Sequence, residues 1–231
     1  MNILVTGCSG FIGYHLCLKL LNTKNKIYGL DNLNNYYDLK LKKDRIKILK
    51  KNFKNFLFYK CDVTNHNMLN HIFSNVKKVH AIMHTAGQVT VTESLVDPIK
   101  DFKINGLGTL NLLDLTKKYH SKSKFIFSST NKVYGNLNNI KVKKIKSKYY
   151  LKQNMRGISE NLNVDYCSPY GCSKGSADQY VKDFGRIFKM NTIVLRKSCI
   201  YGQDQLGIKG QGWISYIINQ AIMKKKITIF G

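Results

Sequence analysis

The sequence predicts an α/β fold: a doubly wound parallel sheet with helices on both faces, followed by the start of a smaller carboxy-terminal lobe. Two observations favour this class. Short apolar segments of strand length alternate with longer segments whose apolar residues recur at helical spacing, which is the pattern of a parallel sheet. A glycine-rich turn at residues 7–13 follows the first apolar segment at once. With 231 residues the chain can bury a sizeable core.

The first strand, turn and helix predict a dinucleotide site. Residues 2–6 are typical of a buried strand, and Gly7, Gly10 and Gly13 follow it. Glycines at this spacing let the backbone turn tightly and approach a pyrophosphate, while the next helix offers its amino-terminal N–H groups to the negative charge. Apolar residues recur every four positions from Ile12 onward, as the core-facing stripe of that helix.

A second strand is predicted at 26–30, and it ends in Asp31. An acidic side chain at this point accepts hydrogen bonds from the adenosine ribose hydroxyls and repels a 2′-phosphate. Asn32 stands where an arginine would favour NADP, so NAD is the expected cofactor. A simple turn or helix-capping role for Asp31 is the structural alternative.

The alternation continues with helices expected at 39–51 and from Pro98 onward, and with strands expected at 56–59, 79–83 and 125–127. Ligands of such a sheet lie at the carboxyl ends of its strands. Asp62 follows the third strand and is placed to reach the adenine amino group. His84 follows the fourth strand, and we expect a packed histidine there rather than a catalyst.

Tyr170 and Lys174 are four positions apart in a helix expected over 170–189, so their side chains lie on one face. An isolated phenol has a pKa of about 10, and an ammonium group beside it favours the phenolate. We therefore expect Lys174 to lower the pKa of Tyr170 and make it a usable base. Thr130 lies at the end of the fifth strand, where its hydroxyl can hold a substrate oxygen. A chance pairing on a helix is the alternative interpretation of Tyr170 and Lys174.

Residues 136–157 interrupt the alternation. This stretch contains no acidic residue and shows no clear period, and its seven basic residues are Lys141, Lys143, Lys144, Lys146, Lys148, Lys152 and Arg156. We expect a solvated loop. The alternative is a border of the substrate site that meets the substrate phosphates.

The carboxy-terminal part of the chain is expected to hold a sixth strand at 192–195 and a helix at 214–223. We divide the chain into a cofactor-binding domain that carries the catalytic residues, 1–196, and the beginning of a substrate-binding lobe, 197–231. Residues 227–231 form an apolar, strand-like run without a polar tail. We therefore expect the natural sequence to continue.

Composition sets limits on partners and compartment. The formal net charge is +25, yet the lysines are spread along the chain, which favours solvated basic faces over a nucleic-acid site. No segment is long and apolar enough to predict a membrane span or a signal peptide, so a cytoplasmic location is expected. The six cysteines have no paired spacing, and neither a metal site nor a disulfide framework is predicted.

The glycine turn, Asp31, Thr130 and the Tyr170/Lys174 pair together resemble the extended short-chain dehydrogenase/reductase family of nucleotide-sugar epimerases and dehydratases. The resemblance implies a Rossmann-type domain that holds NAD, with Thr130, Tyr170 and Lys174 as the catalytic residues. Tyr170 and Lys174 also fall at the cofactor, and the other cofactor contacts that it implies are Gly7, Gly10, Phe11, Ile12, Gly13, Asp31, Asn32, Asp62, Val63, Ala86, Gly87, Asn105 and Ser128. The implied substrate contacts are Thr130, Asn131, Lys132, Ser198 and Cys199.

The subgroup follows from residues after the catalytic threonine and near Cys199. Dehydratases of the family carry an Asp-Glu pair after that threonine, whereas Asn131 and Lys132 stand here, so dehydration is not expected. The resemblance is strongest to members that epimerise a CDP-linked sugar at C2. A UDP-sugar 4-epimerase, acting on UDP-glucuronate or UDP-galactose, is the alternative: the run 31–38 favours it, and Cys199 in place of an asparagine opposes it.

The resemblance implies transient oxidation of the sugar to a 2-keto intermediate, with no net redox change. It also implies a homodimer or higher homo-oligomer. The alternative of another class is a non-catalytic protein that binds NAD or nucleic acid. The intact set of Thr130, Tyr170 and Lys174 argues against it, since a binding role does not require all three.

Overall fold

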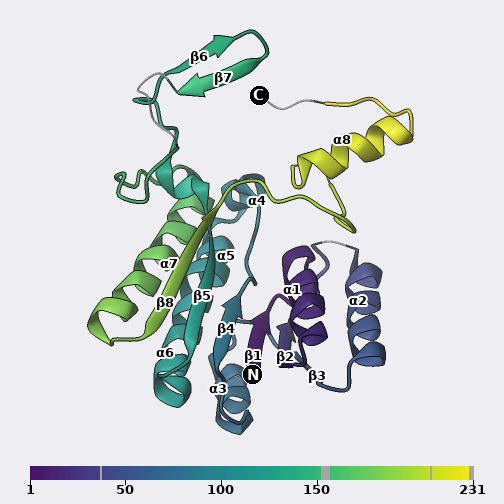
Figure 1. Ribbon diagram of the computed structural model, residues 1–231, viewed down its shortest axis with the longest axis vertical. Helices are drawn as coiled ribbons and strands as arrows, with labels where there is room; N and C mark the ends of the chain where they lie inside the picture. Colours follow the sequence, from purple (N-terminus) through teal and green to yellow (C-terminus); the bar gives the residue numbers. More distant parts are fainter. Residues whose placement is uncertain (37, 152–156, 209, 229–231) are drawn as a thin grey trace.

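A six-stranded parallel sheet forms the centre of the molecule (Figure 1). The computed structural model describes residues 1–36, 38–151, 157–208 and 210–228. The sheet order is β3-β2-β1-β4-β5-β8, and the strands are β1 (Asn2–Thr6), β2 (Lys26–Asp31), β3 (Phe56–Lys60), β4 (Ala81–His84), β5 (Lys124–Thr130) and β8 (Asn191–Lys197). The predicted doubly wound parallel sheet is confirmed, with the switch in strand order between β1 and β4.

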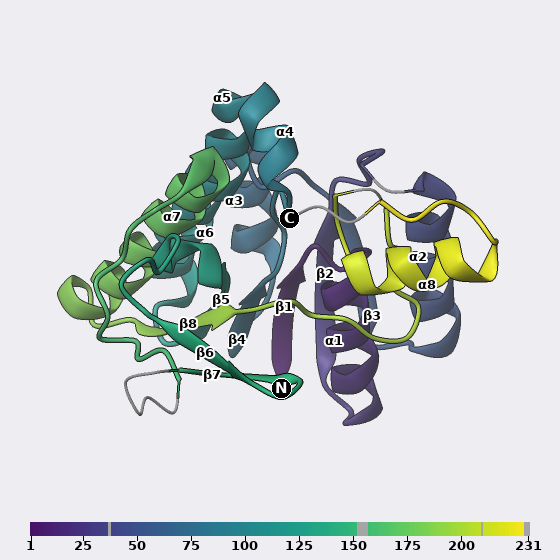
Figure 2. The same ribbon diagram turned by 90° about the horizontal axis from the view of Figure 1, so that it is seen from above.

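Helices cover the two faces of the sheet as separate layers. One layer consists of α1 (Phe11–Asn22) and α2 (Leu39–Asn52), and the other of α3 (His66–Asn75), α6 (Gly108–His120) and α7 (Ser168–Ile187). Figure 2 shows the two layers on opposite sides of the sheet. Successive side chains of a strand face these two layers in turn. In β1, Ile3 and Val5 pack in the core beneath α1 and α2, whereas Leu4 packs in the core on the other side of the sheet.

The long helix expected from Pro98 is present but interrupted. It consists of α5 (Pro98–Phe102), a π-helical turn (Lys103–Leu107) and α6, and a short helix α4 (Val91–Val96) precedes it. The Asp97 side chain accepts a hydrogen bond from the Lys100 N–H and so caps α5. The π turn carries Asn105, whose side chain is thereby turned inward and buried.

The basic stretch was wrongly predicted as a loop without regular structure, because it contains a β-hairpin. Strands β6 (Val142–Ile145) and β7 (Lys148–Leu151) pair antiparallel and project from the body of the molecule (Figure 1). Lys143 lies opposite Tyr150 and Lys144 opposite Tyr149. Both faces of the hairpin are exposed, apart from half-buried Leu151. A strand without a buried face shows no alternation of apolar and polar residues, and so gives no signal in the sequence.

Smaller differences concern element ends. Helix α7 begins at Ser168 rather than Tyr170, and β4 ends at His84 rather than at residue 83. Strand β8 extends to Lys197 rather than to residue 195, and α8 covers Trp213–Ile222 rather than 214–223. The proposed division between 196 and 197 stays a prediction. Tyr37, Lys152, Arg156 and residues 229–231 of the apolar run lie outside the described residues. Across the part of the chain that the structure describes, no helix has both the length and the apolarity to cross a bilayer.

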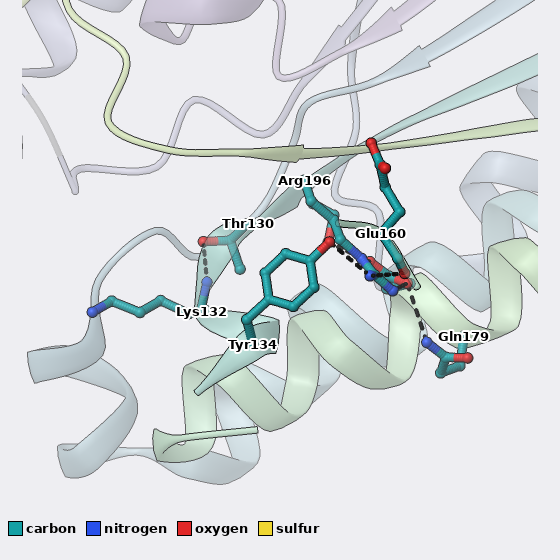
Figure 3. Close-up of polar contacts among 8 residues, drawn as sticks. Thr130, Lys132, Tyr134, Glu160, Gln179 and Arg196 are labelled. Carbon is teal, nitrogen blue, oxygen red and sulfur yellow. Dashed lines mark hydrogen bonds and ion pairs between the residues drawn. The ribbon is translucent and has the colours of Figure 1, made fainter. Parts of the chain in front are cut away.

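A buried ion pair joins α7 to the end of the sheet. Arg196 of β8 donates to both carboxylate oxygens of Asp178, with Nε–Oδ2 and Nη2–Oδ1 distances of 2.9 Å, and the Ser129 hydroxyl donates to the same carboxylate at 2.8 Å. Arg196 also donates to the Tyr134 hydroxyl and the Glu160 carbonyl (Figure 3). Asp178 is fully buried, so this bidentate pair fixes α7 against β5 and β8.

We expect Asp178→Ala to destabilise the protein by about 3–5 kcal/mol, because it leaves the Arg196 guanidinium buried without its carboxylate partner. Urea unfolding followed by circular dichroism measures the change. Asp114→Ala serves as the control, since Asp114 pairs with Lys117 at the surface and such pairs contribute at most about 1 kcal/mol. Equal losses in the two variants would contradict the assignment.

Candidate active site

A cavity of about 680 Å³ lies at the carboxyl ends of the strands. It is lined by residues of β2, β5 and β8, by the segments that follow β1, β3 and β4, and by residues of α1, α2 and α7. The predicted site residues that line it are Gly7, Gly10, Phe11, Ile12, Gly13, Asp31, Asn32, Asp62, Val63, Ala86, Gly87, Ser128, Thr130, Tyr170, Lys174, Ser198 and Cys199. Residues far apart in the sequence therefore meet in one cavity, as the carboxyl-end rule for parallel sheets requires.

Three predicted residues do not line the cavity. Asn105 is buried beneath it, and Asn131 and Lys132 are exposed at a 3-10 turn after β5. The backbone N–H of Lys132 donates to the Thr130 hydroxyl at 3.3 Å, while Figure 3 shows the Lys132 side chain extending away from Thr130. The substrate contacts of Asn131 and Lys132 and the cofactor contact of Asn105 stay predictions.

The glycine turn forms a cradle that side chains would fill. Gly7 has a φ of +71°, and a Cβ there would lie 2.8 Å from the Ala86 backbone nitrogen. A Cβ at Gly13 would collide with the Gly7 carbonyl oxygen. Gly10 begins α1 without a side-chain cap, which leaves the first N–H groups of the helix available to an anion. These features fit the diphosphate of a dinucleotide such as NAD.

Acidic residues at the end of β2 and after β3 line the same cavity as this cradle. The Asp31 carboxylate accepts from the backbone N–H groups of Ser9 at 3.0 Å and Leu33 at 2.9 Å, and so ties the glycine turn to β2. The Asn32 side chain donates to Asp62 at 2.7 Å. Burial raises the pKa of Asp62, but hydrogen bonds from Asn32 and Thr64 outweigh it and leave that pKa below its ordinary value. The Asp62 carboxylate is therefore an ionised acceptor at neutral pH.

Tyr170 and Lys174 are one helical turn apart on α7, and the Thr130 hydroxyl hydrogen-bonds the Tyr170 phenol. The Lys174 ammonium lies 4.3 Å from the centre of the Phe127 ring. Burial, and next the charge of Lys197, lower the pKa of Lys174 to about 7, against the opposing effects of Asp101 and Asp178. Near neutral pH, Lys174 is therefore divided between its charged and neutral forms.

The expected lowering of the Tyr170 pKa is absent from this structure. Burial raises the pKa of the phenol, the Thr130 hydrogen bond lowers it, and Asp101 raises it further. The pKa of Tyr170 is not lowered because both groups are desolvated. Lys174 has a pKa of about 7 and is only partly charged at neutral pH, so it stabilises a phenolate less than a fully charged lysine does.

A buried network of hydrogen bonds lies next to Lys174 and joins α7 to α5 and the π turn. The Asn105 amide donates to Asp101 and to the Ser173 hydroxyl, each at 3.1 Å, and the Ser173 hydroxyl donates to Asp101. The side-chain oxygen Oδ1 of Asn105 accepts a hydrogen bond from the Gln88 backbone N–H at 3.0 Å. Asn105 thus couples the π turn, the loop after β4 and α7, which explains why its side chain is turned away from the cavity.

Asp101, Lys197 and Arg45 are among the residues of the site that were not predicted from the sequence. Arg45 of α2 donates to the carbonyl oxygens of Ser9 at 3.1 Å and Asp204 at 2.6 Å, so it joins the glycine turn to the segment after β8. The sequence held one signal for Lys197, a second cation directly after Arg196 at the end of a strand. Asp101 and Arg45 sit on helices among many charged residues, and nothing in the sequence distinguishes them.

His84 is a packed residue, as predicted. It is buried between the hydroxyls of Thr6, at 2.7 Å, and Thr109, at 3.0 Å. Burial, with the charge of Lys174, lowers its pKa to about 3, so it is neutral at physiological pH. Within the described ranges, no group of three or more His, Cys, Asp or Glu side chains is arranged to hold a metal ion.

The lowered pKa of Lys174 predicts a pH-dependent stability. An unfolded lysine keeps its proton up to about pH 10.4, whereas folded Lys174 loses it near pH 7, so stability rises with pH across that window. We expect Lys174→Met to be more stable than the wild type by roughly 3 kcal/mol at pH 6.5, and this advantage to shrink by pH 9.5. Urea unfolding at the two pH values measures it. The control is Lys182→Met, which replaces an exposed lysine of α7, and a constant gain in Lys174→Met would contradict the prediction.

A sequence profile described as "NAD dependent epimerase/dehydratase family" matches residues 3–231. The CDP-paratose 2-epimerase of Salmonella typhi is 37% identical over 236 residues, which is all of this chain and 68% of that protein. A putative UDP-glucose 4-epimerase of Methanocaldococcus jannaschii is 31% identical, over 99% of this chain and 66% of that protein. The chain thus spans about two thirds of the length of these relatives.

Solved structures agree in fold. The UDP-glucuronic acid 4-epimerase of Bacillus cereus, in complex with UDP-glucuronic acid and NAD, has a TM-score of 0.81 and 30% identity, over 100% of this chain and 66% of that one. The Thermus thermophilus UDP-glucose 4-epimerase, in complex with NAD, has a TM-score of 0.80 and 26% identity, over 99% and 65%. With a profile match over nearly its whole length and a curated relative at 37% identity, the chain belongs to the NAD dependent epimerase/dehydratase family.

Proposed function

We propose that this protein epimerises a nucleotide sugar with bound NAD, and that the substrate is CDP-paratose, converted to CDP-tyvelose by inversion at C2. The observation that carries the proposal is the convergence of Thr130, Tyr170 and Lys174 with the glycine turn in one cavity. Proton transfer needs a titratable group at the reacting hydroxyl, and a dinucleotide needs the glycine cradle. The cavity offers both.

The proposed reaction is an oxidation followed by a reduction at the same carbon. Bound NAD would supply the acceptor for the C2 hydride and then its donor. Tyr170 takes the proton of the C2 hydroxyl on its phenolic oxygen and gives it back after the 2-keto sugar has presented its other face. Thr130 holds the sugar oxygen beside that phenol. Lys174, in its ammonium form, stabilises the phenolate and reaches the nicotinamide ribose.

The choice of substrate rests on similarity and on one substitution. The Salmonella typhi relative is a CDP-paratose 2-epimerase, and Cys199 lines the cavity where 4-epimerases of the family usually carry an asparagine. The second candidate is a UDP-sugar 4-epimerase acting on UDP-glucuronate or UDP-galactose. The run 31–38 favours it, as does the likeness in fold to a UDP-glucuronic acid 4-epimerase.

A non-catalytic NAD-binding or nucleic-acid-binding role is the candidate of another class. It leaves unexplained why the Thr130 hydroxyl, the Tyr170 phenol and the Lys174 ammonium share one cavity. Retention on nucleic acid that disappears at moderate salt would mark any such binding as non-specific. The cytoplasmic location stays a prediction from the sequence.

We also propose that the protein forms a homodimer through α4 and α5. These helices, which pack against α7, present an exposed apolar strip of Leu95 (64% exposed), Val96 (87%), Ile99 (68%) and Phe102 (50%). A contiguous strip of this kind is typical of a protein interface. A second copy of the same surface provides a self-complementary apolar partner.

The first experiment is to incubate the protein with CDP-paratose, UDP-glucuronate and UDP-galactose in parallel, followed by proton NMR of the sugar signals. We expect inversion at C2 of CDP-paratose without net NADH. Inversion at C4 of a UDP-sugar instead would move the second candidate to first place. No change in any of the three sugars would leave the proposed activity unsupported.

Tyr170→Phe is expected to lower kcat by about 10²–10⁴-fold, because the phenylalanine cannot carry the proton. Bound NAD, measured by absorbance after denaturation, should be unchanged. Tyr180→Phe is the matched control, since Tyr180 is an exposed tyrosine on the same helix, and its activity should equal that of the wild type. A Tyr170→Phe variant with full activity would exclude Tyr170 as the acid and base.

For the dimer, Val96→Asp is expected to produce monomers, because it buries a carboxylate in the apolar strip at the interface. Analytical ultracentrifugation measures the mass. The control Ile222→Asp changes another strongly exposed apolar residue, on α8, which lies near α1 and α2 and away from α5 (Figures 1 and 2). A wild-type protein that sediments as a monomer would overturn the proposal.

A further inference from the structure

Lys197 lines the cavity that holds Tyr170 and Lys174, and the proposed mechanism gives it no role. It is the last residue of β8 and pairs in register with Thr130 of β5. The charge of Lys197 acts on Lys174, so the two ammonium groups are close enough to repel.

The neighbouring cation, Arg196, is placed differently. Successive side chains of a strand point to opposite faces of the sheet, and Arg196 points toward α7, where Asp178 neutralises it. Lys197 points to the other face. Burial alone lowers the pKa of Lys197, with no acidic side chain among the causes, and no hydrogen bond or ion pair joins it to any residue in the described ranges.

A partly desolvated ammonium group without a carboxylate is unfavourable by itself, and a bound anion compensates for the cost. The NAD diphosphate is not that anion, because it belongs to the glycine turn after β1. Strand β8 lies three strands away in the sheet order, a distance of roughly 14 Å. The cavity at β8 is bordered instead by Thr130, Ser198 and Cys199, where the nucleotide sugar is expected.

We propose that Lys197 binds an anionic oxygen of the nucleotide sugar, from its diphosphate or from a sugar carboxylate, and that this contact charges the catalytic lysine when substrate arrives. The inference rests on the proposed function and extends it. The anion cancels the positive charge of Lys197. Lys174 then holds its proton more strongly, and the phenolate of Tyr170 is stabilised only while substrate is present.

The surroundings of Lys174 support this coupling. The groups that face it are Asp101 from α5, Asp178 from α7, Lys197 from β8, neutral His84 from β4 and the Phe127 ring from β5. Asp101 and Asp178 are already engaged, by Ser173 and Asn105 and by Arg196 respectively. Lys197 is therefore the charge in this set that a ligand in the cavity can reach and neutralise.

The test compares the wild type with Lys197→Met, which removes the charge at similar length, and with Lys197→Arg, which retains it. Calorimetric titrations use CDP, UDP, UDP-glucose and UDP-glucuronate. We expect Lys197→Met to weaken at least one class of ligand by about 10-fold or more, as for the loss of a charge-assisted hydrogen bond, and Lys197→Arg to retain most of the affinity. Weaker binding of CDP and UDP identifies the diphosphate. Weaker binding of UDP-glucuronate alone identifies a sugar carboxylate.

A second readout follows the charging of Lys174 directly. In ¹⁵N-lysine NMR of the wild type, the tighter-binding nucleotide should move the titration midpoint of the Lys174 ammonium to higher pH. In Lys197→Met the midpoint should already be higher without ligand, and the nucleotide should move it little. Circular dichroism and retained NAD show that each variant is folded.

The outcomes separate the two proposals. If the wild type binds none of the four nucleotides, the proposed function fails and this inference fails with it. If the wild type binds them and Lys197→Met binds all four equally well, the anion site at Lys197 is wrong while the proposed function stands. If affinity falls but the Lys174 midpoint does not respond to ligand, the coupling is wrong and only the anion contact remains.

Discussion

The bidentate pair between Arg196 and Asp178 is the interaction on which the arrangement of the site depends. Asp178 lies one turn beyond Lys174 on α7, and it binds β8 through Arg196 and β5 through Ser129. Helix α7 cannot slide or turn against the sheet without breaking these contacts. They consequently set how far Tyr170 and Lys174 reach over the ends of the strands. A charge pair of this kind is costly to bury, and here its two direct hydrogen bonds and those from Ser129 and to Tyr134 offset that cost.

Unequal neutralisation of buried charges distinguishes the catalytic end of the molecule from its core. Arg196 has a full partner, and Lys174 has two carboxylates nearby that other groups already engage. Burial alone lowers the pKa of Lys197, with no acidic side chain of the described residues among the causes. Neutralisation of these cations by acidic side chains thus decreases from the α7 side of the sheet toward the cavity. Stability is therefore supplied beneath the site, while the charges at the cavity are left for cofactor and substrate to complete. This arrangement is a common way for an active site to hold perturbed groups in place.

The glycine turn and the π turn both bring separate segments of the chain close together at the site, by different means. The missing side chain of Gly7 lets the loops after β1 and β4 touch, and that of Gly13 lets α1 pack against the glycine turn. The π turn at Lys103–Leu107 instead rotates Asn105 inward, where its amide joins the loop after β4 to α7 through Gln88, Asp101 and Ser173. Both devices bring backbone segments at the floor of the cavity into contact, and the proposed proton and hydride transfers would need such an alignment.

The sequence by itself predicted the sheet, the glycine cradle and the presence of Thr130, Tyr170 and Lys174 in the site. Each of these depends on local spacing: the apolar runs have strand length, the glycines precede a helix, and Tyr170 and Lys174 are one turn apart. Tertiary structure alone decided the rest. Asp101, Arg45 and Lys197 are ordinary charged residues until the fold places them beside Lys174, Ser9 and Thr130. The hairpin β6–β7 gave no period because neither face is buried, and the raised pKa of Tyr170 arises from burial, which no spacing of residues reports.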